Sequence, residues 1–428
     1  MIPVGKSELL LFDELPVQTS IAAAGWSDYH SISDPASSAQ LEFYIPGAQD
    51  EYVDFNDTKL YLDMSIEAAP DAAVVAPANN LLGSLFSDVS VQLNDVTIQG
   101  GEPYYPYKAM IETLLMFDSG TKKTQLRTSG YIKDTAGKVD NAAGNLGYKS
   151  RVAMVAGKKH FEIIGPVHVD LATQPRYMLP RVDVRLRLVR AATTFVIDAF
   201  DPAKQPTACK INIHKAILYV RKVRVLPSVQ HGHELGLQTQ NAIYPIQHVS
   251  MDSHTVPSGQ QSFTKENIFQ GRMPKFMVVG MVSNAAFVGA YKSNPFNFQH
   301  FGISYLGLFR DGECVPERTP FDMPDADHYI RAYMATIHAL EQFNRNENNG
   351  ITLDDFIGGS MLFAFNLTPD LTAGGNSGGV QQPFRTGNLR LELKFKTALA
   401  EPINIIYYGV FDGKIEVTKE RTIHLDYL

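Results

Sequence analysis

The sequence predicts an all-β protein made of two antiparallel β-sandwiches. Short segments that are apolar at every second residue recur along the chain, separated by turns rich in Gly, Pro, Asn and Asp, which is the pattern of antiparallel sandwiches. Strong helical periodicity occurs in only two places. The second half also repeats the order of the first at an offset of roughly two hundred residues, which indicates a duplicated domain.

The predicted strands are short and rich in β-branched and aromatic residues. Those of the first half are 41–45, 59–64, 89–93, 160–164, 182–189 and 211–225. Asn94 and Asp95 form a predicted hairpin turn after residues 89–93, because both residue types favour turns. Those of the second half are 276–282, 303–309, 362–365, 389–395, 403–410 and 415–417.

Two segments have the apolar spacing of an amphipathic helix. The first places on one face Tyr107, Met110, Ile111, Leu114 and Leu115. The second nearly repeats this spacing with Ile330, Tyr333, Met334, Ile337 and Leu340. Asp325 or Asp327, after Pro324, is a candidate N-cap for the second helix. We expect each apolar face to be buried against its own sandwich.

Corresponding segments of the two halves resemble each other. Each helix follows a strand, a polar turn and a second short strand, at 96–99 and at 313–315. Residues 184–188 (VRLRL) match 389–393 (LRLEL), and residues 210–213 (KINI) resemble 402–405 (PINI). We therefore divide the chain into an N-terminal arm (1–38), a first sandwich (39–226), a linker (227–241) and a second sandwich (242–428).

The composition indicates a protein that hides much of its surface. Of its 428 residues, 44% are hydrophobic and 19% are charged, whereas globular domains carry about 25% charged residues. We infer that partner subunits cover part of the surface. The balance of 38 Lys and Arg against 45 Asp and Glu gives a net charge of −7, which offers no general attraction to nucleic-acid phosphates.

The sequence contains no recognised catalytic or cofactor-binding motif. It lacks a phosphate-binding loop, a dinucleotide fingerprint, the HExxH zinc motif and the G-x-S-x-G nucleophile elbow. Residues 374–379 (GGNSGG) follow no strand into a helix and are interpreted as a surface loop. We expect no catalytic, cofactor-binding or metal site, and we do not expect an enzyme.

Two clusters have side chains that metals bind. The first consists of His231, His233 and Glu234, which suit zinc but have no further ligand at a fixed spacing. The second consists of Asp322, Asp325 and Asp327, which suit calcium, although helix capping explains them equally well. We interpret the first cluster as solvated residues and the second as helix-capping residues.

Three basic clusters are candidates for contact with nucleic acid. They are Lys122 with Lys123, then Lys158 with Lys159 and His160, then Arg221 with Lys222 and Arg224. None is interleaved with aromatic residues, on which nucleic-acid bases would stack. Solvated loops and strand ends are therefore the preferred interpretation.

The chain carries no predicted targeting segment. Residues 9–12 (LLLF) are too few for a secretory signal and have acidic neighbours. No stretch approaches 18 apolar residues, so we expect no membrane-spanning helix. Cys209 and Cys314 are too few for a disulfide framework, so we expect reduced thiols and folding inside the cell.

Several strings of this sequence are similar to the major capsid protein of Polinton/Maverick elements and related adintoviruses. They are residues 6–21 (KSELLLFDELPVQTSI), 81–95 (LLGSLFSDVSVQLND), 105–115 (YPYKAMIETLL), 182–191 (VDVRLRLVRA), 218–229 (LYVRKVRVLPSV), 294–316 (NPFNFQHFGISYLGLFRDGECVP), 363–371 (FAFNLTPDL) and 387–395 (GNLRLELKF). They occur in the same order as in the family, and the similarity is weaker at residues 121–158 and 371–386. They mark structural strands, so the resemblance transfers no catalytic residue.

This resemblance implies a double jelly-roll, in which two eight-stranded sandwiches with short helical insertions lie side by side in one chain. It implies that three chains form a trimeric capsomer of pseudo-hexameric outline and that such capsomers tile an icosahedral shell. The implied partners are two further copies of the chain, neighbouring capsomers and a minor capsid (penton) protein, with nucleic acid enclosed but not specifically bound. The implied location is the virion, after synthesis inside the host and assembly in its cytoplasm or nucleus.

The arm, residues 1–38, is predicted to lie outside both sandwiches. It contains Pro3, Pro16 and Pro35 and has little periodicity. Its apolar residues 9–12 should order only when buried, since burial contributes about 25 cal/mol per Å² of apolar surface. We expect the arm to lie against the inner base of the capsomer or against a neighbouring capsomer, and its removal to leave a folded trimer.

A double β-sandwich carbohydrate-binding or glycan-processing protein is the alternative interpretation. Such proteins also carry two sandwiches, and pairs of acidic residues are easily placed on their strands. The absence of a predicted secretion signal argues against this alternative. Trp26 is the only tryptophan, so a tryptophan platform for sugar rings is not expected.

Overall fold

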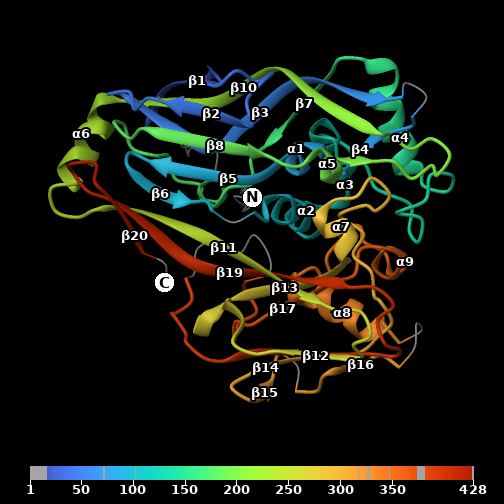
Figure 1. Cartoon of the computed structure of the whole chain (residues 1–428). Coiled ribbons are helices and arrows are strands. Elements are labelled where there is room, and N and C mark those ends of the chain that lie inside the picture. The colour runs from blue at the N-terminus through green and yellow to red at the C-terminus, as the bar shows by residue number, and fades with distance from the viewer. Residues whose placement is uncertain are drawn as a thin grey trace, which may run out of the picture.

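The computed structural model describes residues 17–70, 73–101, 103–316, 318–324, 328–346, 348–373 and 381–426. It contains two antiparallel β-sandwiches in one chain (Figure 1). The first sandwich, blue to green in Figure 1, lies above the second, yellow to red, and strands β11 and β19 lie along the border between them. This arrangement confirms the predicted all-β class.

The first sandwich consists of two four-stranded sheets. In spatial order, one contains β1 (Ile21–His30), β10 (Ala208–Val225), β3 (Glu51–Ala69) and β7 (Phe161–Pro166). The other contains β2 (Gln40–Ile45), β8 (Val184–Arg190), β5 (Phe86–Leu93) and β6 (Val96–Gln99). Asn94, in the turn between β5 and β6, has a φ of 51°, a left-handed conformation that Asn tolerates. A small separate sheet pairs β4 (Ala76–Pro77) with β9 (Ile197–Asp198).

The second sandwich is built in the same way from two five-stranded sheets. One contains β11 (Ala242–Val256), β19 (Ile403–Val417), β13 (Phe276–Ser283) and β17 (Leu362–Asn366), with β20 (Ile423–Asp426) paired to β19. The other contains β12 (Ser262–Lys265), β18 (Leu389–Phe395), β14 (Ile303–Arg310) and β15 (Glu313–Cys314), with β16 (Phe321–Asp322) paired to β14.

The two sandwiches share one topology. The order β1-β10-β3-β7 becomes β11-β19-β13-β17, and the order β2-β8-β5-β6 becomes β12-β18-β14-β15. The similar strings VRLRL and LRLEL lie in the equivalent strands β8 and β18, and KINI and INI lie in the equivalent strands β10 and β19. The repeated order seen in the sequence is therefore a repeated strand order in space.

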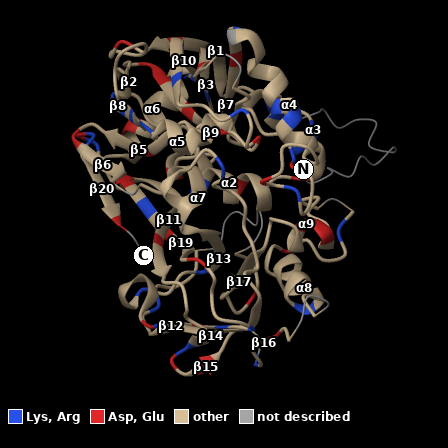
Figure 2. Cartoon of the chain, turned by 45° about the vertical axis from the view of Figure 1, so that its right-hand side comes forward, with Lys and Arg blue, Asp and Glu red and all other residues tan. Residues whose placement is uncertain are grey.

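Short helices fill the connections between strands. They are α1 (Leu81–Ser84), α2 (Tyr105–Leu115), α3 (Ser119–Lys123), α4 (Leu146–Val155), α5 (Thr193–Val196), α6 (Pro227–Gly236), α7 (Asn284–Val288), α8 (Ile330–Ala339) and α9 (Leu353–Ile357). Single 3₁₀ turns are η1 (Gln125–Ser129), η2 (Ala156–Lys158), η3 (Asp170–Thr173) and η4 (Ile268–Gly271). Figure 2 shows α3 and α4 above α9 and α8 along one side of the molecule. Within the described residues, no helix has the length and apolar character needed to cross a membrane.

Helix α2 buries the apolar face that its sequence predicts. All five residues of that face, Tyr107 to Leu115, are buried. The expectation that it packs only on its own sandwich is incomplete, because the Tyr107 ring contacts Phe195 of the first sandwich and Phe287 and Phe296 of the second. Ring centroids stand 5.6 to 5.9 Å apart in these pairs. Helix α2 therefore lies between the two halves.

Helix α8 buries the predicted face only in part: Leu340 is buried and Tyr333 packs against the core of the second sandwich. Ile330 is 56% exposed, whereas Ala332, Thr336 and Ala339 are buried. The small side chains let the helix approach β17, and the Thr336 hydroxyl donates to the carbonyl of Leu362 in that strand at 3.2 Å. The helix starts at Ile330 without a side-chain cap, and the candidate caps Asp325 and Asp327 lie outside the described residues.

The predicted arm and linker need correction. Residues 21–30 of the expected arm form β1, which pairs with β10 from Ile21 opposite Val225 to His30 opposite Ile217. This strand is at the sheet edge and is largely exposed, so it is held by backbone pairing and shows no apolar alternation. The expected linker contains α6, which begins at Pro227. Residues 1–16 and the predicted loop 374–379 lie outside the described residues.

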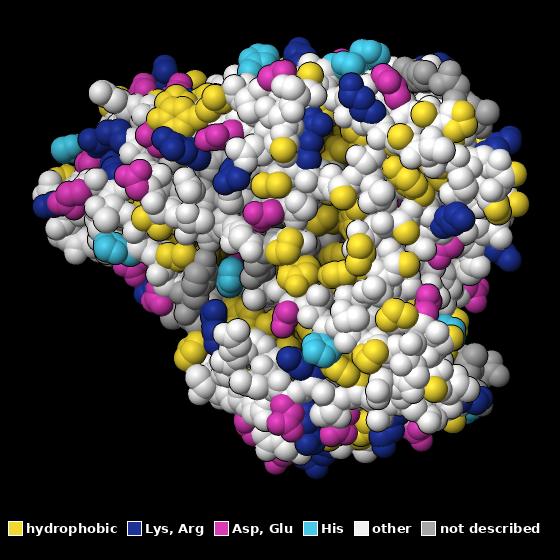
Figure 3. All heavy atoms as spheres, viewed as in Figure 1, with side chains coloured by type: hydrophobic (Ala, Val, Ile, Leu, Met, Phe, Trp, Pro, Cys, Tyr) yellow, Lys and Arg dark blue, Asp and Glu magenta, His cyan; other side chains and the backbone are white. Residues whose placement is uncertain are grey.

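One of the apolar core clusters extends through both sandwiches. One cluster of buried residues includes Leu62 and Leu218 of the first sandwich together with Ile246, Phe276 and Tyr408 of the second. A further cluster fills the interior of the second sandwich. In Figure 3, hydrophobic side chains gather in the middle of the face, where the two sandwiches meet. The two halves are therefore packed as one body.

Candidate functional site at the junction of the two sandwiches

The junction, which we call the seam, is where α2, α3, η1 and η3 of the first sandwich meet β11, β19 and residues 294–298 and 349–360 of the second. Helix α2 is placed there by its apolar face, and η3 lies against β11. Besides the apolar core, the seam contains buried ionic groups that connect the two halves. These groups determine how firmly one sandwich is fixed to the other.

The first ionic group joins three elements. Lys108 of α2 donates to Asp170 Oδ1 of η3 at 2.5 Å, and His248 Nδ1 of β11 lies 3.0 Å from Asp170 Oδ2. Asp170 is 1% exposed. Burial alone would raise the pKa of Asp170, but Lys108 and His248 hold that pKa below its usual value. The buried carboxylate of Asp170 therefore stays ionised, with Lys108 at one oxygen and His248 at the other.

A second polar group centres on Glu112 of α2. His168 Nδ1 lies 2.6 Å from Glu112 Oε2, and the Tyr408 hydroxyl of β19 donates to Glu112 Oε1 at 3.4 Å. Burial raises the pKa of Tyr408 far above its usual value, and Glu112 raises it further. The phenol therefore remains a donor, and it links β19 to α2.

Lys122 of α3 is the third connection. Its ammonium donates to the carbonyl of Leu114 and, at 2.7 Å, to the carbonyl of Asn349 in the second sandwich. Its side chain is 7% exposed. Burial lowers the pKa of Lys122 to about 7. The sequence interpretation of Lys122 as a solvated residue is therefore wrong.

Glu234, one of the candidate zinc ligands, lies on α6, in the segment that connects the two sandwiches. Its carboxylate accepts from Arg181 at 2.5 Å and from Arg421 at 2.7 Å. Arg421 also donates to the Pro180 carbonyl at 2.9 Å. His233 shares a hydrogen bond of 2.8 Å with the Tyr52 hydroxyl. These residues connect α6 and the C-terminal segment to the first sandwich, which gives them a structural role.

No metal site forms among the described residues, where no three His, Cys, Asp or Glu side chains gather at ligand distance. Of the candidate calcium ligands, Asp322 is exposed at the end of β16, and Asp325 and Asp327 lie outside the described ranges. Cys209 and Cys314 are not joined by a disulfide bond.

The basic cluster on β10 is neutralised by its neighbour β3. Arg221 lies 2.8 Å from Asp54, and Lys222 lies 3.1 Å from Glu51. Arg224 lies 3.1 Å from Asp50, the residue that precedes β3. Figure 2 likewise shows blue and red residues scattered over the molecule. This cluster therefore offers little net positive charge for a phosphate backbone.

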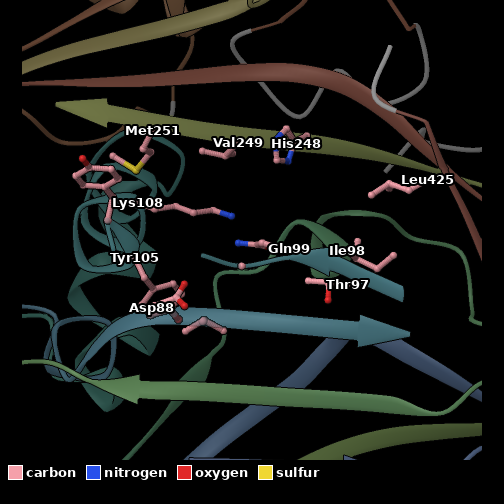
Figure 4. Close-up of a pocket in the computed structure, with 13 residues that line it drawn as sticks. Asp88, Thr97, Ile98, Gln99, Tyr105, Lys108, His248, Val249, Met251 and Leu425 are labelled. Atoms are coloured by element: carbon pink, nitrogen blue, oxygen red, sulfur yellow. The ribbon is translucent and has the colours of Figure 1, made fainter. Parts of the chain in front are cut away.

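A small cavity of about 190 Å³ borders the first ionic group. Its lining includes Tyr105 and Lys108 of α2, His248 and Met251 of β11, and Gln99 of β6. Figure 4 shows the side chains of Lys108 and Gln99 directed toward one another below β11, with Leu425 of β20 at the opposite end. The cavity is therefore bordered by polar side chains of both sandwiches, next to the ion pair of Lys108 and Asp170.

Stability should rise with pH because of Lys122. The unfolded lysine keeps its proton up to a pKa near 10.5, whereas the folded one loses it near 7. Between these pH values the unfolded state binds more protons, so raising the pH increases the free energy of unfolding by at most about 1.4 kcal/mol per pH unit. In Lys122→Met this contribution should be missing. Urea unfolding of both proteins from about pH 7 to pH 10 measures the difference, and equal slopes would contradict the burial of a neutral lysine.

Comparison with known proteins identifies the fold. No family model matches the chain. An uncharacterised protein of Caenorhabditis elegans is 25% identical over 304 residues, which cover 70% of each chain. A chain of the Sputnik virophage structure aligns with a TM-score of 0.69 at 12% identity, covering 100% of this chain and 93% of that one.

Two major capsid proteins align over nearly the whole chain. The mavirus major capsid protein gives a TM-score of 0.54 at 10% identity, covering 97% of this chain and 92% of its own. The faustovirus major capsid protein gives 0.56 at 7% identity, covering 95% and 92%. At such low identity, the alignments show a shared architecture and no more. This architecture includes the two sandwiches with the same strand order. This chain therefore has the double jelly-roll fold of viral major capsid proteins.

Proposed function

We propose that this protein is a major capsid protein whose trimers form pseudo-hexameric capsomers that tile an icosahedral shell. The observation that carries the proposal is the pair of sandwiches with one strand order, joined by a shared core and a buried ionic seam. One chain thereby presents two equivalent building blocks at a fixed relative orientation. Fold similarity to viral capsid proteins along nearly the whole chain supports the same role.

The geometry explains why three copies suffice. Each chain has two equivalent sandwiches, so three chains together place six similar sandwiches around one axis. This gives a near-hexagonal outline that packs in a plane. A closed ring of three requires heterologous contacts between different surfaces of neighbouring copies. A rigid seam serves this purpose, because a hinge between the sandwiches would allow the ring to close at other copy numbers.

The proposed partners follow from this assembly. They are two further copies of this chain, neighbouring capsomers and a minor capsid (penton) protein at the vertices, and the shell would enclose nucleic acid without reading its sequence. We place the protein in the virion and assign it no enzymatic activity. The strings quoted from the sequence favour the lineage of Polinton/Maverick elements and adintoviruses.

The glycan alternative gains no support from Trp26. Its ring is 46% exposed, but the ammonium of Lys59 lies 4.3 Å from the ring centroid. A sugar that stacks on this ring would have to displace a cation–π contact, which is itself worth about 0.5–1 kcal/mol. Incubation with a glycan array tests the alternative, and specific binding or cleavage would favour it over the capsid role.

Negative-stain microscopy of the purified full chain tests the proposed function. We expect particles of hexagonal outline, and closed shells under conditions that favour assembly. The substitution Lys149→Gln, at an exposed position on α4, is a control that should leave the outline unchanged. Single particles of one chain, without threefold symmetry at any protein concentration, would contradict the proposal.

Two truncations separate the arm from the first sandwich. Removing residues 1–38 deletes β1 and its backbone pairing with β10, so this variant should be less stable in urea. Removing residues 1–16 leaves β1 intact and should give a stable trimer with weakened shell formation. Light scattering and microscopy report the two properties separately. If the shorter truncation forms shells as readily as the intact chain, the arm does not connect capsomers.

A further inference from the structure

A second and larger cavity opens at the seam, beside α3 and α9. It has a volume of about 530 Å³, which lies within the range of about 300–1,000 Å³ typical of small-molecule sites. The first sandwich contributes α2, α3, η1 and residues 131–139, and the second contributes Phe296 and residues 349–360. We call it the α3–α9 cavity. Any ligand held there would contact both sandwiches.

Part of the wall of the α3–α9 cavity is apolar. Met110 and Leu114 come from α2, Tyr131 and Val139 from the segment that follows η1, and Phe296 from the second sandwich. All five side chains are buried in the folded chain. A wall of this kind favours an aliphatic ligand, because apolar surface gains free energy when it leaves water.

The polar part of the cavity has an excess of positive charge. Its two lining carboxylates are already paired, Asp134 with Arg151 at 2.8 Å and Asp355 with Lys133 at 2.5 Å. Three further lining cations remain, namely Lys122, Lys123 and Arg127. Among the described residues, none of the three has a carboxylate within 4.0 Å. Lys122 is buried, while Lys123 and Arg127 are exposed at the rim.

We propose that the α3–α9 cavity binds an amphipathic anion, an alkyl chain that ends in a carboxylate. The chain lies against the apolar wall, and the carboxylate lies between the buried Lys122 and the rim residues Lys123 and Arg127, none of which has a carboxylate partner among the described residues. A small polar anion would leave the apolar wall in contact with water, and a neutral alcohol would leave the cations unpaired. A ligand with an alkyl chain and a carboxylate covers the apolar wall and also pairs with the cations. Because it contacts both sandwiches, it should stabilise their attachment to each other. This inference does not depend on the capsid role.

Thermal unfolding and calorimetric titration with sodium decanoate, below its micellar concentration, test the site on the full chain. We expect saturable binding and a rise in melting temperature, because a ligand that binds only the folded state stabilises it. Sodium butyrate has the carboxylate but a much shorter alkyl chain, and decan-1-ol has a ten-carbon chain but no charge. Both should bind at least tenfold more weakly than decanoate. Equal effects of decanoate and decan-1-ol would show a non-specific detergent action and would overturn the proposal.

Matched charge variants locate the site. The double variant Lys123→Gln and Arg127→Gln changes two exposed rim residues, so it should fold and bind decanoate at least tenfold more weakly. The control double variant Lys149→Gln and Lys204→Gln removes the same charge from exposed positions outside the cavity lining and should bind like the original chain. If the two double variants bind equally well, the cavity is not the site.

Proton uptake provides a further readout. Burial lowers the pKa of Lys122 to about 7, and the charged groups that act on it are Lys133, Asp118 and Asp355. A carboxylate placed beside Lys122 raises that pKa, so binding near pH 7.5 should take up protons from the buffer. Titrations in two buffers of different ionisation enthalpy measure this uptake. In Lys122→Met it should disappear, and unchanged uptake in that variant would contradict the placement of the carboxylate beside Lys122.

Discussion

The substitution Asp170→Ala is expected to lower the free energy of unfolding by about 3–5 kcal/mol, because it leaves the buried Lys108 ammonium without its carboxylate. His248 loses the same partner. Both residues come from elements on opposite sides of the seam, so the damage should fall on the attachment of one sandwich to the other. Urea unfolding at fixed protein concentration measures the loss.

The control for this prediction removes both charges. The double variant Lys108→Met and Asp170→Leu removes the ammonium and the carboxylate together, so that only His248 loses a partner. Apolar residues of similar size often replace a buried ion pair at little cost. Most of the lost stability should therefore return. A double variant as unstable as Asp170→Ala would contradict the account, since the loss would then come from packing and not from an isolated charge.

The substitution Leu114→Ala should lower the free energy of unfolding by about 2–5 kcal/mol, because it removes a buried apolar side chain and leaves a cavity in the core. Leu114 is 5% exposed and belongs to the apolar cluster that joins the two sandwiches. It is also next to the α3–α9 cavity, so some relaxation is possible and the lower half of the range is expected. The readout is again the free energy of unfolding in urea.

Leu146→Ala is the matched control for Leu114→Ala. Leu146 starts α4 and is 69% exposed, and substitutions at such surface positions usually change stability by no more than about 0.5 kcal/mol. An equal loss in both variants would mean that the stability of the chain does not depend on the buried face of α2.

The sequence predicted those elements whose residues alternate regularly. Residues 41–45 and 89–93 have apolar side chains on one face, and they lie in β2 and β5 with an alternating pattern of burial. The repeated order of strand, turn, strand and helix was also visible, because equivalent positions in a duplicated fold face the same packing constraints. The double jelly-roll itself was implied by resemblance, and the structural alignments bear it out.

Elements without such a pattern were missed. Strand β1 is an exposed edge strand, so backbone hydrogen bonds hold it and its side chains carry little signal. Helix α4 buries Tyr148, Arg151 and Val155. Arg151 is fully buried, where it donates to the Pro77 carbonyl and pairs with Asp134. Because a charged residue lies on the buried face, the sequence of α4 lacks the apolar spacing that would predict a helix.

The seam could not be predicted from local sequence. Lys122 was interpreted as solvated because it lies beside Lys123 in a polar stretch, yet its acceptor on Asn349 is more than two hundred residues away. Asp170 and its partner His248 are 78 residues apart, and Glu112 and its partner Tyr408 are 296 residues apart. Such groups come together only when the two sandwiches pack against each other. The spacing of apolar residues along the sequence does not predict these contacts.

The mass of the purified full chain in solution tests the central claim most directly. Light scattering should give three times the 47.4 kDa of one chain, or the much larger mass of assembled shells, and the trimer should persist on dilution because obligate interfaces are large. A mass of one chain that stays constant over the whole accessible concentration range would contradict the account of this protein as a trimeric capsomer subunit.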